Sequence, residues 1–100
     1  MRTREKSYED YGMTHNEREY IKKFCRESTK EQQKIINTAL SGQDPYIASK
    51  CFKSLVEDKS YEDLCMEEYL YIGKGDFYGH RRQGMAAIKR WMILYGIWDM

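Results

Sequence analysis

The chain has 100 residues, of which 41% are hydrophobic and 33% are charged, a balance typical of one well-solvated globular domain. Its longest apolar run, residues 91–98, is far shorter than the roughly 20 residues that cross a membrane. Residues 1–6 lack the apolar core of a signal peptide, so we expect a cytoplasmic protein without membrane contact. The formal net charge of +1 argues neither for nor against binding to nucleic acid, so the distribution of charge along the chain is more informative.

The nucleophilic and metal-ligating residue types show no pattern of a catalytic or metal site. Cys25, Cys51 and Cys65 are odd in number and lie in no paired-spacing motif, so we expect reduced, buried thiols. His15 and His80 stand apart from each other and from the cysteines, without the spacing of metal ligands. Because no nucleophile–base pair is present either, we expect neither an enzyme nor a bound metal or other cofactor.

The first part of the chain divides into an arm and a helix. Residues 1–12 are polar and show no helical periodicity, which predicts an extended N-terminal arm. Thr14 and Glu17 then form the capping-box pattern, in which each side chain accepts a hydrogen bond from a free backbone N–H at a helix start. The first helix should bury the apolar residues at helical spacing, namely Met13, Tyr20, Ile21, Phe24 and Cys25.

Two further helices follow after short connections. Ser28 and Glu31 repeat the capping-box pattern, and Gly42 suits the end of the second helix. Asp44 and Pro45 predict the start of the third helix, because they combine an N-cap carboxylate with a proline in the first helical position. The residues that these helices should bury are Ile35, Ile36, Ala39 and Leu40, and then Ile47, Ala48, Cys51, Phe52, Leu55 and Val56.

The remaining residues predict a short helix and a long one. Ser60 and Asp63 cap the fourth helix, whose Tyr61, Leu64 and Cys65 should point inward. Residues 69–75 form the connection, and the fifth helix should run over residues 76–95, with Gly96 as its C-terminal cap. Because no alternating strand pattern is present and there is one proline, we expect an all-α five-helix bundle that forms a single domain over residues 1–100.

The last two helices, over residues 60–95, have the makings of a helix-turn-helix. Residues 54–70 carry six acidic residues and one lysine, whereas residues 74–90 carry five basic residues and one aspartate. A short fourth helix would brace the scaffold so that the basic fifth helix projects from it. Positive charge on a projecting helix is the arrangement that binds the phosphates of DNA.

Two runs in this region carry a resemblance to a known group of proteins. They are Ser-Tyr-Glu-Asp-Leu-Cys at 60–65 and Ile-Gly-Lys-Gly-Asp-Phe-Tyr-Gly-His-Arg-Arg at 72–82. Residues 54–90 thereby resemble the C-terminal part of small phage and integrative-element proteins of Gram-positive bacteria, and are similar to the RinA/ArpU-type late-operon regulators, which resemble region 4 of sigma factors. The connection over residues 69–75 is about two residues longer than in the sigma pattern. The resemblance implies a DNA-binding protein of a phage-like mobile element.

A helical wheel at about 100° per residue divides the fifth helix into two faces. The core face should hold Phe77, Gly84, Ile88, Trp91, Met92 and Tyr95. On the opposite face, Arg82, Lys89 and Arg90 are candidates for phosphate contacts and Gln83 is a candidate base reader, with Gly79 and Ala86 small enough for a partner to approach. Lys74 and Tyr78 flank the helix start and complete the candidate DNA-binding set. The alternative is that this basic face is simply solvated.

Arg81 falls on the core face of the same wheel. A charged group on an apolar face requires a partner, because an unpaired buried charge is costly. We therefore expect a structural ion pair between Arg81 and one of the acidic residues Asp63, Glu67 and Glu68.

Residues 91–98 are more hydrophobic than one helix face can bury. The surplus residues are Ile93, Ile97 and Trp98. They either cover the first helix or form an oligomer interface, which would make the protein a homodimer.

Two functions remain open from the sequence. The first is a DNA-binding or transcription-associated regulatory protein of a phage-like mobile element, with double-stranded DNA as partner. The second is a protein-binding module, such as an RNA-polymerase-binding factor or an inhibitor of a host defence nuclease of the anti-CRISPR type. The feature that discriminates them is whether the basic face of the fifth helix is exposed or covered.

Overall fold

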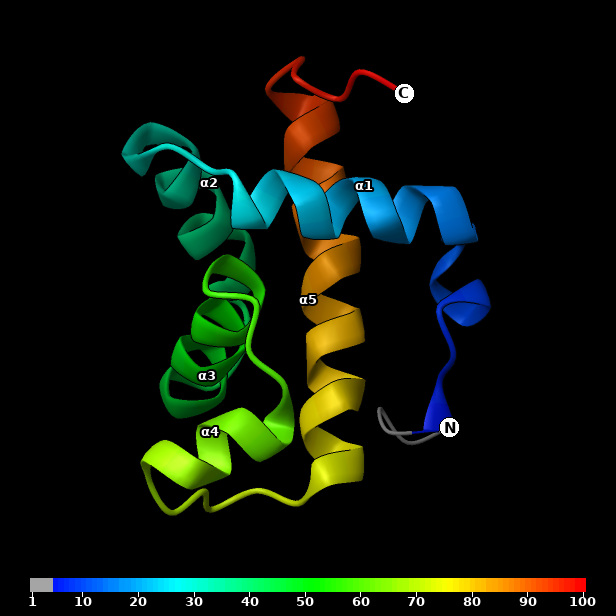
Figure 1. Ribbon diagram of the computed structural model, residues 1–100. Coiled ribbons are helices and arrows are strands. Elements are labelled where there is room, and N and C mark those ends of the chain that lie inside the picture. Colours follow the sequence, from blue (N-terminus) through cyan, green and yellow to red (C-terminus); the bar gives the residue numbers. More distant parts are fainter. Residues whose placement is uncertain (1–4) are drawn as a thin grey trace.

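One long helix organises the fold. In the computed structural model, which describes residues 5–100, α5 (Lys74–Leu94) runs through the middle of the molecule (Figure 1). Around it lie α1 (His15–Arg26), α2 (Lys30–Leu40), α3 (Pro45–Val56) and α4 (Tyr61–Glu67), preceded by the 3-10 helix η2 (Glu9–Tyr11). The described residues contain no strand, so the predicted all-α bundle of five α-helices is confirmed.

The other helices meet mainly through α5. In Figure 1, α1 crosses α5 at a steep angle, α2 and α3 lie along one flank, and the N-terminal segment runs along the other. The most extensive contact between two elements is that of α2 with α5, followed by that of α3 with α5. The hydrophobic core around α5 contains Ile21, Ile36, Leu55, Phe77 and Ile88, all of which are buried.

Burial on two sides distinguishes α5 from an amphipathic surface helix. Its main core face contains Phe77, Met85, Ile88 and Met92, but Gly79 and Ala86, on the opposite side of the wheel, are buried as well. A helix that is buried on two sides lies inside a domain, whereas a surface helix has one apolar stripe. We had expected Gly79 and Ala86 to be open to a partner. Both are instead part of the packed structure.

Local capping chemistry sets most of the helix starts. The Thr14–Glu17 box is formed, with the Glu17 N–H donating to Thr14 Oγ1 at 3.2 Å, and Ser60 and Asp63 form the same arrangement at the start of α4. The Asp44 carboxylate accepts from two backbone N–H groups of α3. α5 begins at Lys74, two residues earlier than expected, with Gly73 at its N-cap, and Gly96 after its end has a φ of 72°.

The predicted start of α2 was wrong by one residue. Thr29 and Gln32 form the capping box, whereas the Ser28 hydroxyl donates to the Cys25 carbonyl at 2.7 Å and so helps to end α1. The two possible boxes overlap by one position in the sequence, and Ser28 cannot serve the preceding and the following helix at the same time. The helix itself was expected and is present.

The N-terminal segment is not the extended arm that was expected. Of the predicted arm, residues 1–4 lie outside the described part of the chain, and residues 9–11 form η2, which packs against α5. Gly12 ends η2 with a φ of 73°, a left-handed conformation that glycine adopts without strain. Tyr8 and Tyr11 pack against the core, and the Tyr8 hydroxyl donates to Met85 Sδ at 3.7 Å. The packing of the Tyr8 and Tyr11 rings on the core therefore holds this N-terminal segment in place, although its sequence has no helical periodicity.

Candidate functional site

α5, the helix that was expected to project and bind DNA, is the central element of the fold. α4, a connection and α5 follow one another in the expected order, but α5 has neighbours on several sides and does not project from the scaffold (Figure 1). Its first turn is exposed at Lys74, Gly75 and Asp76. The six candidate DNA-binding residues must therefore be considered one by one.

Arg82 and Lys89, the two expected phosphate contacts on one side of α5, have internal partners. The Arg82 Nε–H donates to the Lys6 carbonyl at 2.8 Å, and its guanidinium lies 5.9 Å from the centre of the Tyr8 ring. Lys89 Nζ lies 2.6 Å from Glu17 Oε2 and 5.5 Å from the centre of the Trp98 ring. Arg82 thus ties the N-terminal segment to α5, and Lys89 ties α1 to α5.

The ion pair with Lys89 also affects the titration of Glu17. The hydrogen bond from Lys89, followed by the one from the Thr14 backbone N–H, holds the pKa of the Glu17 carboxyl below its ordinary value. One carboxylate therefore caps α1 with one oxygen and pairs with α5 through the other.

The other four candidates are spread along α5. Gln83 and Arg90 are exposed next to a narrow groove of about 150 Å³ between α2 and α5. Lys74 is paired with Glu62, and the Tyr78 hydroxyl accepts a hydrogen bond from the Tyr61 N–H at 2.9 Å, which fixes α4 to α5. At about 1.5 Å per residue, Lys74 and Arg90 lie some 24 Å apart along the helix. The structure does not gather these residues into one basic surface.

Arg81 does not form the ion pair that was expected with the acidic residues of α4. Its Nη1 donates to Ser54 Oγ at 3.2 Å, and its guanidinium lies 5.4 Å from the centre of the Tyr78 ring. The Asp63 carboxylate instead accepts from the Ser60 N–H at 2.9 Å. The prediction was wrong because it considered only the cations of α5.

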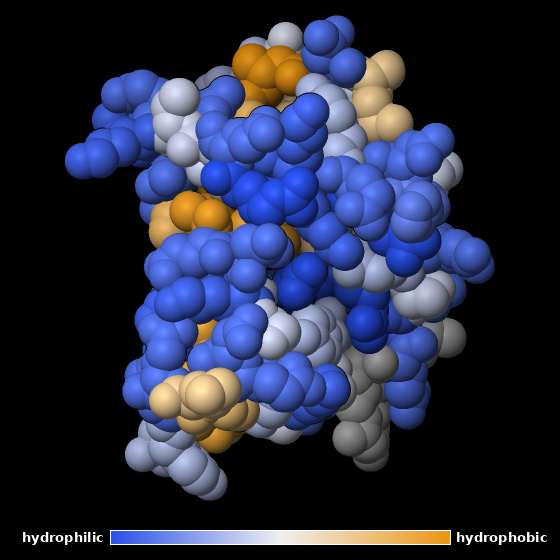
Figure 2. Space-filling view, in the orientation of Figure 1, coloured by the Kyte–Doolittle hydropathy of each residue, from blue (hydrophilic) through white to orange (hydrophobic). Residues whose placement is uncertain are grey.

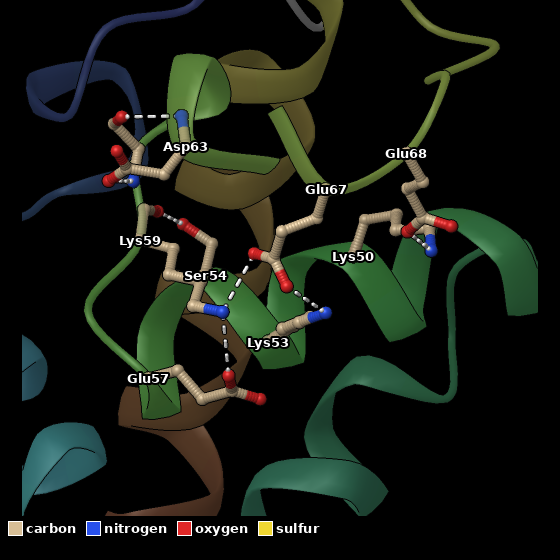
Figure 3. Close-up of polar contacts among 9 residues, drawn as sticks. Lys50, Lys53, Ser54, Glu57, Lys59, Asp63, Glu67 and Glu68 are labelled. Atoms are coloured by element: carbon tan, nitrogen blue, oxygen red, sulfur yellow. Dashed lines mark hydrogen bonds and ion pairs between the residues drawn. The ribbon is translucent and has the colours of Figure 1, made fainter. Parts of the chain in front are cut away.

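Lysines of α3 and of the following loop neutralise α4 instead. Figure 3 shows Glu67 between Lys53, at 2.9 Å, and Lys59, at 2.7 Å, while Glu68 pairs with Lys50. These contacts lower the pKa of Glu67, chiefly through the hydrogen bond from Lys59, and raise the pKa of Lys59. The negative charges of Glu67 and Glu68 are thus balanced by lysines and not by the basic residues of α5.

An exposed aromatic cluster, which sequence reasoning missed, lies at the α4 end of the molecule. We call the exposed Tyr69 and Tyr71, together with the half-buried Tyr46, the tyrosine surface. Tyr69 and Tyr71 are 77% and 81% exposed, and their rings meet edge to face with centroids 4.9 Å apart. The Tyr71 N–H donates to the Tyr46 hydroxyl at 3.0 Å, and the rings of these two residues are 6.1 Å apart. Residues 69–75 were taken only as a connection, although two tyrosines at alternate positions distinguish them.

The surroundings of the tyrosine surface contribute a hollow and a charged rim. Residues 69–73 and Tyr61 line an open groove of about 380 Å³. Lys50, which is paired with Glu68, lies 5.3 Å from the centre of the Tyr46 ring. The Met66 side chain, in the last turn of α4, is almost fully exposed. Figure 2 shows apolar atoms over α4, at the lower left of the view.

The opposite end of α5 carries a second exposed apolar area. We call Ile93, Leu94, Tyr95 and Ile97 the C-terminal apolar surface; all four are exposed. Trp98, which was expected to be surplus with Ile93 and Ile97, is half-buried and meets Tyr20 of α1 edge to face, with centroids 4.9 Å apart. Trp98 therefore covers α1, whereas Ile93 and Ile97 remain open to solvent.

The three thiols differ in their surroundings. Cys25 and Cys51 are buried as expected, and burial raises the pKa of each to about 12. Cys65 is exposed, which corrects the expectation that it points inward. α4 spans seven residues, and Leu64 is its one buried residue, so the short helix presents only a narrow face to the core.

Three further observations bear on the class of protein. Among residues 5–100, no three His, Cys, Asp or Glu side chains are grouped as metal ligands would be. None of the helices that the structure describes has both the length and the apolar character needed to cross a bilayer. No family model, no curated protein and no solved structure matches the chain.

Proposed function

We propose that the chain is a small protein-binding module and that the tyrosine surface contacts its partner. The observation that carries this proposal is the pair of exposed rings of Tyr69 and Tyr71, held in one arrangement by ring contacts and by the hydrogen bond from the Tyr71 N–H to the hydroxyl of the half-buried Tyr46. Tyrosine is enriched at protein interfaces because it buries a large area and has few rotatable bonds to fix. Rings that are already ordered lose little entropy when a partner covers them.

The charges around the tyrosine surface favour a protein partner over a nucleic acid. Aromatic rings can also stack on the bases of single-stranded nucleic acid, but such sites combine the rings with cations that attract phosphate. The nearby cations here, Lys50 and Lys74, are paired with Glu68 and Glu62. An aromatic centre with a rim of balanced charge is the usual composition of a protein–protein interface.

Capture from bacterial lysate, with nuclease added, tests the proposal. We expect the wild type to retain a specific protein and the Tyr69→Ser/Tyr71→Ser variant to lose it. Tyr95→Ser is the matched control, because it removes an exposed tyrosine at the other end of the molecule and should retain the same protein. RNA polymerase and a host defence nuclease are the example partners considered for a protein-binding module. If the double variant retains the partner as well as the wild type does, the proposal is wrong.

Binding of double-stranded DNA through α5 is a second candidate function. The observation that favours it is the exposure of Gln83 and Arg90 on one side of the helix. Fluorescence anisotropy with duplex DNA at low salt is the test. If DNA binding is the function, Arg90→Ala should weaken binding and show a slope of log affinity against log salt that is shallower by about 0.9, because Arg90 is exposed and can meet one phosphate. Absence of salt-dependent binding by the wild type would exclude this candidate.

A further inference from the structure

The last turn of α5 exposes apolar side chains around the whole outer half of the helix. Ile93, Leu94 and Tyr95 are consecutive and exposed, and at about 100° per residue they span roughly 200° of the helix circumference. Leu94, in the middle, is 73% exposed. A continuous apolar surface of this kind marks an interface, whereas single exposed apolar residues do not.

A hollow lies directly beside this protrusion. A groove of about 350 Å³ is bounded on one side by Ile35 and Thr38 of α2 and on the other by Tyr95 and Ile97. The wall formed by Ile97 is held in position, because its N–H donates to the Met92 carbonyl at 2.9 Å and the following Trp98 packs on Tyr20. The surface thus combines a projecting leucine with an apolar groove that can receive one.

The charges at the rim of the groove complement one another. Glu31 and Lys34 lie one turn apart on α2, are paired with each other and are both largely exposed. Each side chain can therefore leave this pair and form an ion pair with another molecule. When a surface meets a copy of itself about a two-fold axis, residue i of the first copy faces residue j of the second, and residue j of the first faces residue i of the second. Antiparallel pairing of two α2 helices would place Glu31 of each copy opposite Lys34 of the other. A partner whose surface carries charge of one sign would leave either Glu31 or Lys34 without an opposite charge.

We propose that the C-terminal apolar surface joins two copies of this chain about a two-fold axis. Leu94 of each copy occupies the groove between α2 and Ile97 of the other, and the Glu31 and Lys34 side chains cross-pair at the rim. Figure 2 shows the apolar atoms at the top of the view, over the C-terminal end of α5, and the tyrosine surface is at the far end of that helix. The proposal is therefore independent of the function proposed for the tyrosine surface.

Sedimentation equilibrium at concentrations from about 1 to about 200 µM tests the association. We expect the mass to rise with concentration from 12.0 kDa to twice that value. Leu94→Arg should remain a monomer throughout, with a helical circular dichroism spectrum like that of the wild type because Leu94 is exposed. Met66→Arg is the matched control and should dimerise normally, since it places the same charge on an exposed site near the tyrosine surface.

The two-fold arrangement is tested by mixing two charge variants. Glu31→Lys leaves only positive charge at the rim, and Lys34→Glu leaves only negative charge, so each variant alone should dimerise at least several-fold more weakly than the wild type. An equimolar mixture should recover the association, because each chain then meets a rim of opposite sign. Contacts within one chain cannot produce recovery on mixing.

Three outcomes would overturn the dimer proposal. They are a wild type that stays at 12.0 kDa over the whole range, a Leu94→Arg variant that dimerises normally, and charge variants that regain nothing when mixed. None of these outcomes affects the protein-binding proposal, which is decided by the variants of Tyr69 and Tyr71.

Discussion

At Gly84 a single missing side chain determines how closely two helices pack. A Cβ atom at this position would lie 2.5 Å from Leu40 Cδ2. This atom is at the end of a flexible side chain, which can move aside where the packing leaves space. Leu40 is 1% exposed, so its side chain can turn away only within the packed interior of the bundle. Glycine lowers the stability of an isolated helix, and here the close contact between α2 and α5 explains its presence.

Gly84→Ala should destabilise the protein. Overpacking of a buried site costs about 1–3 kcal/mol, of which the better helix propensity of alanine offsets about 1 kcal/mol. We expect the free energy of unfolding, measured by urea denaturation, to fall by up to about 2 kcal/mol. Gly42→Ala is the control, because its added Cβ would meet no atom within 4 Å, and it should be neutral or slightly stabilising. A Gly84→Ala protein more stable than the wild type would contradict this account.

Residue-level features could be predicted from the sequence where they depend on near neighbours in the chain. The boxes at Thr14 and Ser60 were predicted because their partners lie three positions away. The partner of Glu67 could not be predicted in this way, since its pairing with Lys53 requires that α3 and α4 already lie side by side. The same holds for Tyr71 and Tyr46, which are 25 positions apart.

At the scale of elements, the start of α1 is joined to the C-terminal half of α5 by the carboxylate of Glu17. It accepts from the Thr14 N–H at 2.9 Å through one oxygen and pairs with Lys89 through the other. The wheel assigned Lys89 to an exposed face because it assumed that α5 is buried on one side only. Burial of Ala86 and the contact with Glu17 show why an amphipathic pattern cannot be read from a central helix.

The ion pair between Glu17 and Lys89 makes stability depend on pH. Because the pKa of Glu17 is lower in the folded state than its ordinary value of 4.5, the pair stabilises the fold above about pH 4.5 and ceases to do so as the pH falls through the lowered pKa. Glu17→Gln keeps an oxygen for the Thr14 N–H but removes the charge. We expect the melting temperature of the wild type to exceed that of Glu17→Gln at pH 7, and the difference to shrink as the pH falls below 4.5.

Glu19→Gln is the control for this experiment. It removes the same charge from an exposed site on α1, where Lys22 is 3.8 Å away. Its melting temperature should stay close to that of the wild type over the same pH range, since exposed ion pairs contribute little to stability. A difference between the wild type and Glu17→Gln that is constant with pH would show that the ion pair is not its cause.

At the scale of the whole molecule, the cysteines report on opening of the fold. Cys25 lies on α1 and Cys51 on α3, and both are buried, whereas Cys65 is exposed. The thiolate is the reactive form, and burial raises the pKa of Cys25 and Cys51 to about 12. Modification of the two buried thiols therefore requires the bundle to open.

Titration with a chromogenic disulfide reagent at pH 8 should show one fast thiol and two slow ones. Cys65→Ser should abolish the fast phase and leave the slow phase unchanged. The slow phase should accelerate several-fold in Gly84→Ala, because a destabilised bundle opens more often. Three thiols that react at the same fast rate in the native protein would contradict the packing described for α1 and α3.

The fold class could be predicted because capping and periodicity are local, but the arrangement of the helices could not. Nothing in the fifth helical segment alone indicates that it is enclosed by α1, α2, α3 and η2. Its apolar residues fall on two sides, and the second side consists of Gly79 and Ala86, whose small size was taken as access for a partner. Small residues permit close approach by DNA, by another protein or by the same chain alike, so their role depends on the assembled bundle.

The central position of α5 has a consequence for synthesis on the ribosome. α5 follows all the helices that pack against it, and Met92, near its end, is fully buried. α1, α2 and α3 have 12, 11 and 12 residues, lengths at which isolated helices are marginal in water. As translation proceeds at about 5–20 residues per second, these segments emerge before the helix that supplies their main common contact. The nascent chain therefore exposes Ile21, Ile36 and Leu55 until the last turns of α5 have left the exit tunnel, and the bundle closes in one late step.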